Sequence, residues 1–274
     1  MDSRHLFFEG FKPAPIARVA HPAKSSSPRR AAEPEECDAF FGWLFDRAGM
    51  SADHYRGRAL SRRMAACLRA LGVENADQAQ SAIEAQPHLM GAALDSVLLG
   101  VTEFCRDEPV FENLRQIVIP QIVKNIEKPR IWSAACSDGH ELYSMLILFD
   151  QARRLRDIEP IGTDCRSQAV AQAREGIFPL SAIDKLDADL KGKYFETRGN
   201  TARVAPLLRE KAFWKVADLF AGIEPGPFDL ILWRNMSIYL KPESADKIWR
   251  GLIGELSPGG FLVTGKADHP PAGS

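Results

Sequence analysis

Apolar and polar residues follow two different patterns along this chain, and the pattern changes near Thr102. Before that point, apolar residues recur three or four positions apart, the spacing that places them on one face of an amphipathic helix. The stretch Leu60–Leu71 has this spacing and is followed by Gly72, a residue typical of a helix C-cap. We therefore expect an N-terminal all-α domain over residues 37–101, in which one helix covers Leu60–Leu71.

Beyond residue 129, short apolar runs alternate with amphipathic segments. The apolar runs predict strands, and the segments between them predict helices. Strands are expected at residues 130–134, 160–163, 213–217, 228–233 and 260–264, and helices at residues 141–156, 166–175 and 242–256. Such alternation implies right-handed crossovers and a mainly parallel sheet. We predict a doubly wound α/β domain over residues 130–274.

Three further segments have weaker patterns. Residues 102–129 predict a linker and a helix, with Asp107 at the helix N-cap and Pro120 past the helix end. Residues 192–207 surround a Gly-Asn pair and are compatible with either a small hairpin or an irregular loop. Residues 1–36 contain a long stretch rich in Pro, Ala, Ser and Arg, so we expect a disordered leader there.

Composition and charge exclude several classes of protein. The 274 residues carry a formal net charge of -1, so no global field attracts nucleic acid or an anionic membrane. The five cysteines are scattered without zinc-ligand spacing, which indicates reduced thiols and no metal site. No apolar run reaches the roughly 20 residues that a membrane span needs. We expect a cytoplasmic protein with no nucleic-acid partner and no membrane insertion.

The segment from Arg130 to Ile147 joins the first expected strand to its helix through a turn of small residues. In parallel sheets, adenosine-containing ligands bind just beyond the carboxyl ends of strands. Residues small enough to let a ligand approach the backbone are Ser133, Ala134, Ala135, Ser137 and Gly139. Taken alone, this turn is equally compatible with a purely structural role.

Polar residues follow the next three expected strands at the same edge of the sheet. Asp164 ends the second strand, where it would either grip ribose hydroxyls or cap the next helix. Asp218 follows the third strand and is compatible with an adenine contact or with a solvated loop. The fourth strand is followed by three polar residues that would either face a ligand crevice or form a cap and a surface, namely Arg234, Asn235 and Tyr239.

Five segments, taken together and in order, resemble the CheR-type family of chemoreceptor protein-glutamate O-methyltransferases of bacterial chemotaxis. The resemblance extends from about Phe40 to Gly265. Its segments are TEFCRD (102–107), IWSAACSDGHELYS (131–144), GTD (162–164), FDLILWRNMSIYL (228–240) and PGGFLVTGKAD (258–268). The resemblance implies a Rossmann-like S-adenosylmethionine methyltransferase sheet that follows an N-terminal all-α domain.

The resemblance also implies an activity, a cofactor and partners. S-adenosylmethionine would donate the methyl group, S-adenosylhomocysteine would be the product, and glutamate side chains on the cytoplasmic helices of methyl-accepting chemoreceptors would be the acceptors. Arg106 and Tyr239 would hold the acceptor carboxylate. The residues that would bind the cofactor are Thr102, Ala134, Ala135, Ser137, Gly139, Glu141, Asp164, Asp218, Leu219, Arg234 and Asn235. A basic helix face that would dock the acidic receptor contains Arg56, Arg58, Arg62 and Arg63.

The chain departs from the family pattern at several positions. Cys105, Leu142 and Lys266 stand where a Phe, a Pro and a His are usual. His140 replaces a Glu, and it would either carry charge near the cofactor sulfonium or point to solvent. These changes keep an alternative open: a catalytically weak or inactive module that binds S-adenosylmethionine or S-adenosylhomocysteine and acts as a regulatory protein.

The C-terminal part gives two more expectations. Family members continue with two further strands, so these strands are missing by truncation, or a partner or a second copy covers the exposed edge at residues 260–264. The segment 192–207 is short beside relatives that dock a receptor's C-terminal peptide. We therefore expect receptor binding that does not depend on such a tether.

Overall fold

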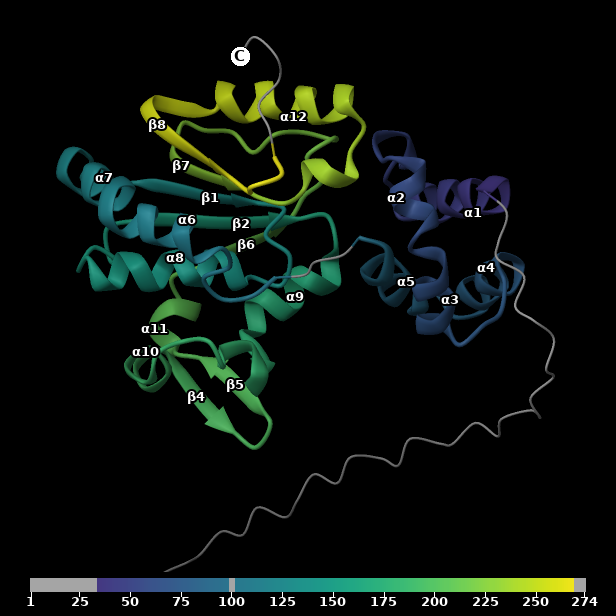
Figure 1. The fold of residues 1–274 in the computed structure, drawn as a ribbon, viewed down its shortest axis with the longest axis horizontal. Coiled ribbons are helices and arrows are strands. Elements are labelled where there is room, and N and C mark those ends of the chain that lie inside the picture. Colours follow the sequence, from purple (N-terminus) through teal and green to yellow (C-terminus); the bar gives the residue numbers. More distant parts are fainter. Residues whose placement is uncertain (1–33, 99–101, 269–274) are drawn as a thin grey trace, which may run out of the picture. The chain divides into compact units, whose positions relative to one another are not determined.

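A computed structural model of the chain describes residues 34–98 and 102–268 (Figure 1). Most of the expected leader, residues 1–33, lies outside these ranges. Helix α1 begins at Pro34, so the last three residues assigned to the leader are helical instead. A helix can start here because proline suits a first helical turn, and because Glu35 and Glu36 lie in that turn, where negative charge is favourable.

The N-terminal part of the described chain is all-helical. Its helices are α1 (Pro34–Arg47), α2 (Gly57–Ser61), α3 (Met64–Leu71), α4 (Ala76–Ala85) and α5 (Leu89–Val97). The expected single helix over Leu60–Leu71 is wrong, because Arg63 N donates to Leu60 O, a bond that tightens the turn and separates α2 from α3. Gly72 ends α3 with a left-handed φ of 70°, as expected of a C-cap.

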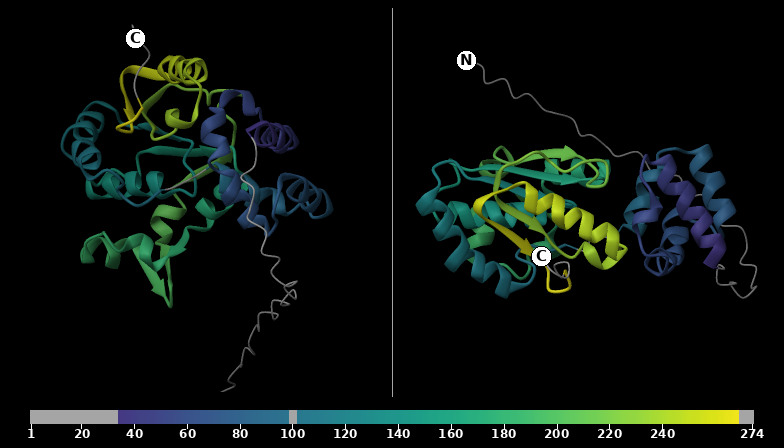
Figure 2. Two further views of the ribbon diagram at one scale, coloured as in Figure 1. Left: turned by 45° about the vertical axis from the view of Figure 1, so that its right-hand side comes forward. Right: turned by 90° about the horizontal axis from the view of Figure 1, so that it is seen from above.

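Five parallel strands form the central sheet in the order β6-β2-β1-β7-β8 (Figures 1 and 2). The strands are β1 (Arg130–Ala134), β2 (Glu159–Asp164), β6 (Phe213–Val216), β7 (Phe228–Trp233) and β8 (Leu256–Thr264). The main flanking helices are α8 (His140–Gln151), α9 (Ser167–Glu175) and α12 (Pro242–Gly254). The predicted doubly wound parallel sheet is therefore confirmed, although β8 begins before residue 260 because Leu256 already pairs with Phe228 across a bulge.

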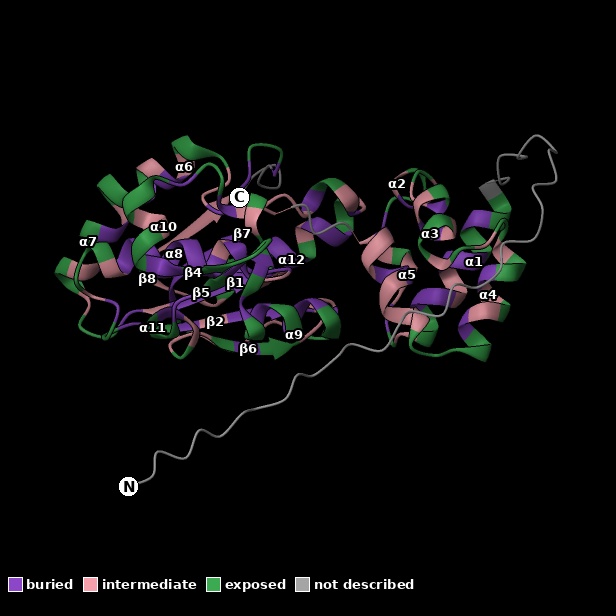
Figure 3. Cartoon of the chain, turned by 90° about the horizontal axis from the view of Figure 1, so that it is seen from below, coloured by how far each residue is buried: buried purple, intermediate pink, exposed green. Residues whose placement is uncertain are grey.

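Helices cover both faces of this sheet. Ile131 and Leu230 pack in one core with helices α8 and α9, whereas Trp132 and Ile231 pack in a second core with helix α12. Neighbouring residues of a strand point to opposite faces, so α8 and α12 lie on opposite sides. Strands buried on both faces read as continuous apolar runs, and β7 is buried at every position (Figure 3).

Three helices end differently from the expectation. Helix α12 stops at Gly254 rather than at residue 256, because Leu256 already belongs to strand β8. Helix α8 stops at Gln151 rather than at residue 156, because Arg153 adopts a left-handed φ of 58°. The linker helix, in contrast, continues past its expected end at Pro120. It consists of α6 (Glu108–Asn113), a π-helical turn η2 (Leu114–Val118) and α7 (Ile119–Asn125). Pro120 lacks an N–H group, but it is the second residue of α7, directly after the wider π-helical turn and Ile119, so the chain stays helical through it.

A second, antiparallel sheet has the strand order β3-β5-β4. Its elements, with the short helices around it, are β3 (Ile177–Pro179), η3 (Leu180–Ile183), α10 (Ala188–Tyr194), β4 (Phe195–Arg198), β5 (Thr201–Val204) and α11 (Pro206–Arg209). Of the two alternatives for residues 192–207, the hairpin is correct, and Gly199 turns it with a φ of 55°. Strand β3 has three residues, too few for a recognisable period.

None of the helices within the described ranges combines the length and the apolar character needed to cross a bilayer. The same residues contain no group of three or more His, Cys, Asp or Glu side chains placed to hold a metal ion.

Candidate active site

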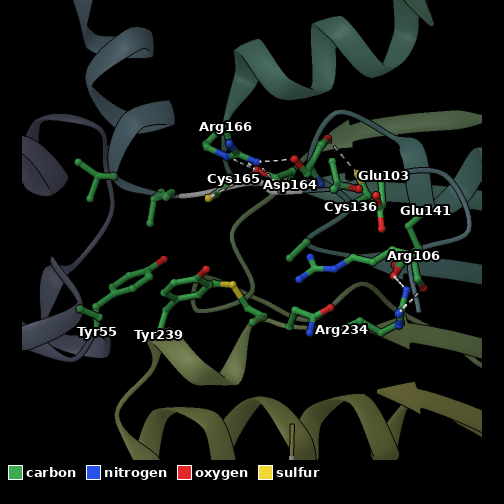
Figure 4. Close-up of a pocket in the computed structure, with 18 of the residues that line it drawn as sticks. Tyr55, Glu103, Arg106, Cys136, Glu141, Asp164, Cys165, Arg166, Arg234 and Tyr239 are labelled. Carbon is green, nitrogen blue, oxygen red and sulfur yellow. Dashed lines mark hydrogen bonds and ion pairs between the residues drawn. The ribbon is translucent and has the colours of Figure 1, made fainter. Parts of the chain in front are cut away.

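A cavity lies at the carboxyl ends of strands β1, β2 and β7 (Figure 4). Parallel sheets bind ligands at this edge, because loops leave neighbouring strands there in opposite directions. Most of the residues that the sequence nominated meet in it. The nominated residues that line the cavity are Thr102, Arg106, Ala135, Ser137, Glu141, Asp164, Arg234, Asn235 and Tyr239.

Four nominated cofactor residues are not part of this lining. Ala134 is buried at the end of β1, and Gly139 forms the N-cap of α8. Asp218 and Leu219 lie in the loop after β6, where Asp218 Oδ1 accepts a hydrogen bond from Phe220 N at 3.0 Å. This is a contact within the loop, and the adenine role of Asp218 stays a prediction.

The turn between β1 and α8 is wound unusually tightly. Ala135, Ser137 and Gly139 all have left-handed φ angles, of 58°, 54° and 96°. Such angles are strained for residues with a Cβ atom, and strain of this kind gathers at ligand sites. A Cβ atom on Gly139 would lie 2.7 Å from the Trp214 ring and 2.9 Å from Ala173 Cβ. The position therefore requires glycine on two independent grounds.

Glu141 and Arg234 form an ion pair beside the cavity. Glu141 Oε2 lies 3.2 Å from Arg234 Nη1, and Glu141 Oε1 accepts a hydrogen bond of 2.8 Å from the Ser133 hydroxyl. Burial raises the pKa of Glu141, and the neighbouring Arg234 opposes that shift. The pair thus places one carboxylate and one guanidinium side by side.

Arg234 also fixes the segment after Thr102. Its Nη2 donates to Arg106 O at 2.7 Å and pairs with Asp107 Oδ2 at 2.6 Å. Asp107 occupies the N-cap position of α6, as expected, but its side chain makes no capping hydrogen bond, because Arg234 engages the carboxylate. The Nε atom of Arg234 is buried without a hydrogen-bond partner among the described residues. It is a donor that a ligand could satisfy.

Asp164 lies under the turn as a buried acceptor. Its Oδ2 accepts a hydrogen bond from Ser137 N at 2.8 Å, and its Oδ1 pairs with Arg166 Nε at 3.0 Å. Arg166 reaches further to Asp95 Oδ1 on α5, at 3.2 Å. Both helix α5 and the sheet thus contribute to this wall of the cavity.

Arg106 and Tyr239 enter the cavity from different segments. In Figure 4 the Arg106 side chain extends into the cavity, while the phenol rings of Tyr55 and Tyr239 line its other end. Tyr239 belongs to the short helix η4 (Ser237–Tyr239), and Tyr239 O accepts a hydrogen bond from Arg56 N at 2.9 Å. The loop that carries Tyr239 is therefore fixed by the residues before α2.

The four nominated docking arginines do not form one helix face, since the helix is divided between α2 and α3. Arg58 and Arg62 are exposed, and Arg63 is half-buried. Arg56 is exposed as a residue, but its Nε donates to Leu240 O at 2.6 Å.

His140 follows neither of the two alternatives set out above. It does not line the cavity and it does not point to solvent; its side chain is only 6% exposed. The ring packs between Phe104 and Phe178, with ring centroids 4.6 and 4.3 Å away, and its Nδ1 lies 2.7 Å from Asp138 Oδ1. The imidazole therefore fills an aromatic cluster. No local sequence pattern predicts this cluster, because Phe104 and Phe178 come from segments far from His140 in the chain.

Several residues of the lining were not expected. They are Tyr55, Ala59, Leu60, Val97, Leu98, Glu103, Cys136, Cys165, Arg166 and Met236. The position of Arg166 could have indicated its place in the lining, because it stands two positions after Asp164 in a strand-to-helix turn. No sequence feature indicated Tyr55, since only the tertiary fold brings the segment before α2 to the sheet.

The donors and acceptors of the cavity fit S-adenosylmethionine. That molecule ends in an ammonium and a carboxylate, and the cavity offers Glu141 beside Arg234, whose Nε is an orphaned buried donor. It also carries a ribose with two hydroxyls, and the cavity offers the buried Asp164. The tightly wound turn at Ala135 leaves backbone where an adenosine ligand can approach.

Comparison with known proteins gives the same assignment. Residues 100–272 match the model of the family described as CheR methyltransferase, SAM binding domain. Chemotaxis protein methyltransferase 1 of Pseudomonas aeruginosa is 28% identical over 64% of this chain and 68% of its own length. Chemotaxis protein methyltransferase Cher2 of Pseudomonas putida is 27% identical over 76% of this chain and 81% of its own length.

Solved structures show weaker similarity. The glycopeptide N-methyltransferase MtfA complexed with sinefungin aligns at 12% identity and a TM-score of 0.34, over 61% of this chain and 51% of that chain. The family match, in contrast, covers more than half of the chain and includes every strand of the central sheet. The chain therefore belongs to the CheR methyltransferase family, with S-adenosylmethionine as its cofactor.

Proposed function

We propose that this protein is a protein-glutamate O-methyltransferase that forms methyl esters on glutamate side chains of chemoreceptor cytoplasmic helices. One observation carries the proposal: Arg106 and Tyr239, from segments far apart in sequence, line the same cavity as Glu141 and Asp164. An acceptor group and a cofactor would thus meet in one enclosed site.

The side chains suit a carboxylate acceptor. A glutamate carboxylate is ionised at neutral pH, so it needs no general base, only positioning and exclusion of water. Arg106 supplies a charge-assisted fork for its two oxygens, and the Tyr239 hydroxyl supplies a further donor. When bound, the cofactor would supply an electrophilic methyl group to one of these carboxylate oxygens, and the products would be a methyl ester and S-adenosylhomocysteine.

The remaining lining divides between the parts of the cofactor. Glu141 would bind the ammonium group, Arg234 the carboxylate and Asp164 the ribose. Contacts along the molecule would come from Thr102, Ala135, Ser137 and Asn235, while Ala134 and Gly139 would shape the turn. The adenine contacts of Asp218 and Leu219 stay predictions.

The acceptor would dock near α2 and α3. Arg58 and Arg62 are exposed there, and an acidic helix offers the complementary charge. Arg56 and Arg63 would contribute less, because Arg56 is engaged with Leu240 O and Arg63 is half-buried. Chemoreceptor cytoplasmic helices carry the glutamates in question, so we propose a cytoplasmic location.

Methyl transfer to receptor signalling domains tests the proposal. Radiolabelled S-adenosylmethionine should give a base-labile label on the receptor, and Arg106→Ala and Tyr239→Phe should lose it. Arg115→Ala is the matched control, since Arg115 lies on the surface of the same segment, paired with Glu112. Binding of S-adenosylhomocysteine without any transfer would instead support the alternative, a module that binds the cofactor or its product and acts as a regulatory protein.

A further inference from the structure

The carboxylate of Asp164 has no acceptor position left for a ligand. Its Oδ1 accepts hydrogen bonds from Arg166 N and Arg166 Nε, both at 3.0 Å. Its Oδ2 accepts from Ser137 N at 2.8 Å and from Arg166 Nη2 at 3.4 Å. A carboxylate offers about four lone-pair sites, so these four N–H donors fill them, and the Cys165 thiol approaches Oδ1 as a fifth, weaker donor at 3.9 Å. A ribose hydroxyl can donate to Asp164 only if one of the four donors moves.

One of the four contacts is easily released. The contact from Arg166 Nη2 to Oδ2 is the longest, and the same nitrogen also donates to Ser137 Oγ at 3.0 Å. The guanidinium is held independently by Nε on Oδ1 and by Nη1 on Asp95 Oδ1, at 3.2 Å. Oδ2 can therefore be freed by a small rotation that breaks no other ion pair.

Arg166 also has a donor to offer. A guanidinium carries five N–H groups. The contacts of Arg166 within residues 34–98 and 102–268 use one hydrogen on Nε, one on Nη1 and two on Nη2. One Nη1 hydrogen is thus without an acceptor in this part of the chain. The side chain is 9% exposed and lines the cavity, so the ligand is the available acceptor.

Arg166 stays charged in this setting. Burial alone would lower its pKa, but the carboxylates of Asp164 and Asp95 outweigh burial and raise the pKa. A ribose diol combines donors and acceptors, because each hydroxyl gives one hydrogen and accepts others. Its hydroxyl can donate to the freed Oδ2 while its oxygen accepts from the guanidinium.

We propose that Asp164 and Arg166 together, rather than Asp164 alone, form the ribose subsite, and that Arg166 is a specificity-determining residue that recognises the vicinal diol of the cofactor. The inference rests on the proposed ribose role of Asp164. Arg166 lies two residues beyond the GTD segment and outside the other segments that carry the family resemblance. The Asp95 contact ties the subsite to helix α5.

Calorimetry with S-adenosylhomocysteine and its 2′-deoxy and 3′-deoxy analogues tests the inference without any catalytic readout. The unaltered protein should bind at least one deoxy analogue about tenfold more weakly, the cost of losing one charge-assisted hydrogen bond. In Arg166→Gln, the ratio of the affinity for S-adenosylhomocysteine to that for the deoxy analogue should fall to within about twofold, because the group that bonds the hydroxyl is gone. Arg174→Gln, in the last turn of the helix that Arg166 caps and bonded to Trp214 O, should keep the full affinity ratio.

Three outcomes would overturn the inference. In the first, Arg166→Gln weakens all three ligands equally, as expected of a structural anchor. In the second, it leaves the ratio unchanged. In the third, the variant binds S-adenosylhomocysteine more tightly and keeps the affinity ratio. This result would mean that Arg166 competes with the ribose for the Asp164 carboxylate. If Arg166→Gln does not fold, Arg166→Lys retains the charge without the planar fork and should lose the ratio in the same way. If the unaltered protein binds none of the ligands, the proposed function itself fails.

Discussion

Arg234 Nη1 lies 3.2 Å from Glu141 Oε2, and this ion pair joins the end of strand β7 to the first turn of helix α8. Arg234 is 2% exposed at its side chain, whereas Glu141 is 14% exposed and reaches the cavity. The guanidinium therefore orients the carboxylate from behind and leaves it partly open to a ligand. The pair also links two of the segments that carry the family resemblance.

This relationship predicts a pH dependence of cofactor binding. Burial raises the pKa of Glu141 above its ordinary value of 4.5, and only the ionised form attracts an ammonium group. The affinity for S-adenosylhomocysteine should thus be complete above the raised pKa and fall as the pH drops through it, sooner than for an exposed glutamate. Calorimetry across acidic pH measures this. Glu141→Gln should bind roughly tenfold more weakly at neutral pH and lose this step; a step that persists in the variant would assign it to another group.

The opposite sign is expected for stability. A carboxyl group whose pKa is raised by folding favours the folded state below its unfolded pKa, and this contribution is lost as the pH rises through the folded pKa. The unfolding temperature of the ligand-free protein, relative to that of Glu141→Gln, should therefore decline as the pH is raised. A difference that does not vary with pH would contradict the buried state of Glu141.

Gly162 is expected to tolerate no side chain. A Cβ atom there would lie 2.6 Å from the Trp214 ring and 3.1 Å from Cys136 Sγ, in a packed core. Gly162→Ala should cost about 1–3 kcal/mol in the free energy of unfolding. Gly42→Ala is the control: no atom lies within 4 Å of the added Cβ in helix α1, so alanine should stabilise by about 0.5–1 kcal/mol. Urea denaturation compares the two, and equal effects would refute this packing.

Asp268 is expected to hold the loop of Asn235. Its carboxylate accepts hydrogen bonds from Ser237 N at 3.0 Å, Ser237 Oγ at 2.6 Å and Gly265 N at 2.9 Å, and also from Asn235 N. Asp268→Ala would leave these buried donors unpaired and should cost about 1–3 kcal/mol in stability.

The same substitution should weaken S-adenosylhomocysteine binding, because Asn235 and Tyr239 share the loop. Lys266→Ala, an exposed change in the same segment, is the control and should alter neither quantity. Normal affinity in Asp268→Ala would show that the loop keeps its shape without the carboxylate.

The two cavity thiols should react slowly. Burial raises the pKa of Cys136 and of Cys165 above the ordinary value of 9.0, and nearby Asp164 adds to both shifts. The nucleophilic thiolate is therefore scarcer at about pH 8 than for a free cysteine. Mass spectrometry after iodoacetamide treatment should find both unlabelled in the native protein and labelled after unfolding. Rapid native labelling of Cys136 would contradict its burial, whereas rapid labelling of the half-buried Cys165 would contradict its raised pKa.

Much of the fold was predictable because its strands and helices follow from the local periodicity of apolar residues. Strands β1 and β7 are buried on both faces, so they read as apolar runs, and their bounds agree with the expectation. The hairpin of β4 and β5 stayed ambiguous, because a Gly-Asn turn between short strands suits a loop equally well. The prediction that the linker helix ends before Pro120 was wrong, since the nearby π-helical turn is not visible in sequence.

The sequence by itself determined the strands of the sheet, their mainly parallel direction and the edge at which a ligand binds, because periodicity and strand ends are local properties. Only the tertiary structure decided which further side chains join the nominated ones at that edge and how they contact one another. It buried His140 between Phe104 and Phe178, placed Tyr55 beside Tyr239, and filled the acceptor sites of Asp164 with Arg166. These outcomes depend on contacts between segments far apart in the chain, and no local pattern encodes such contacts.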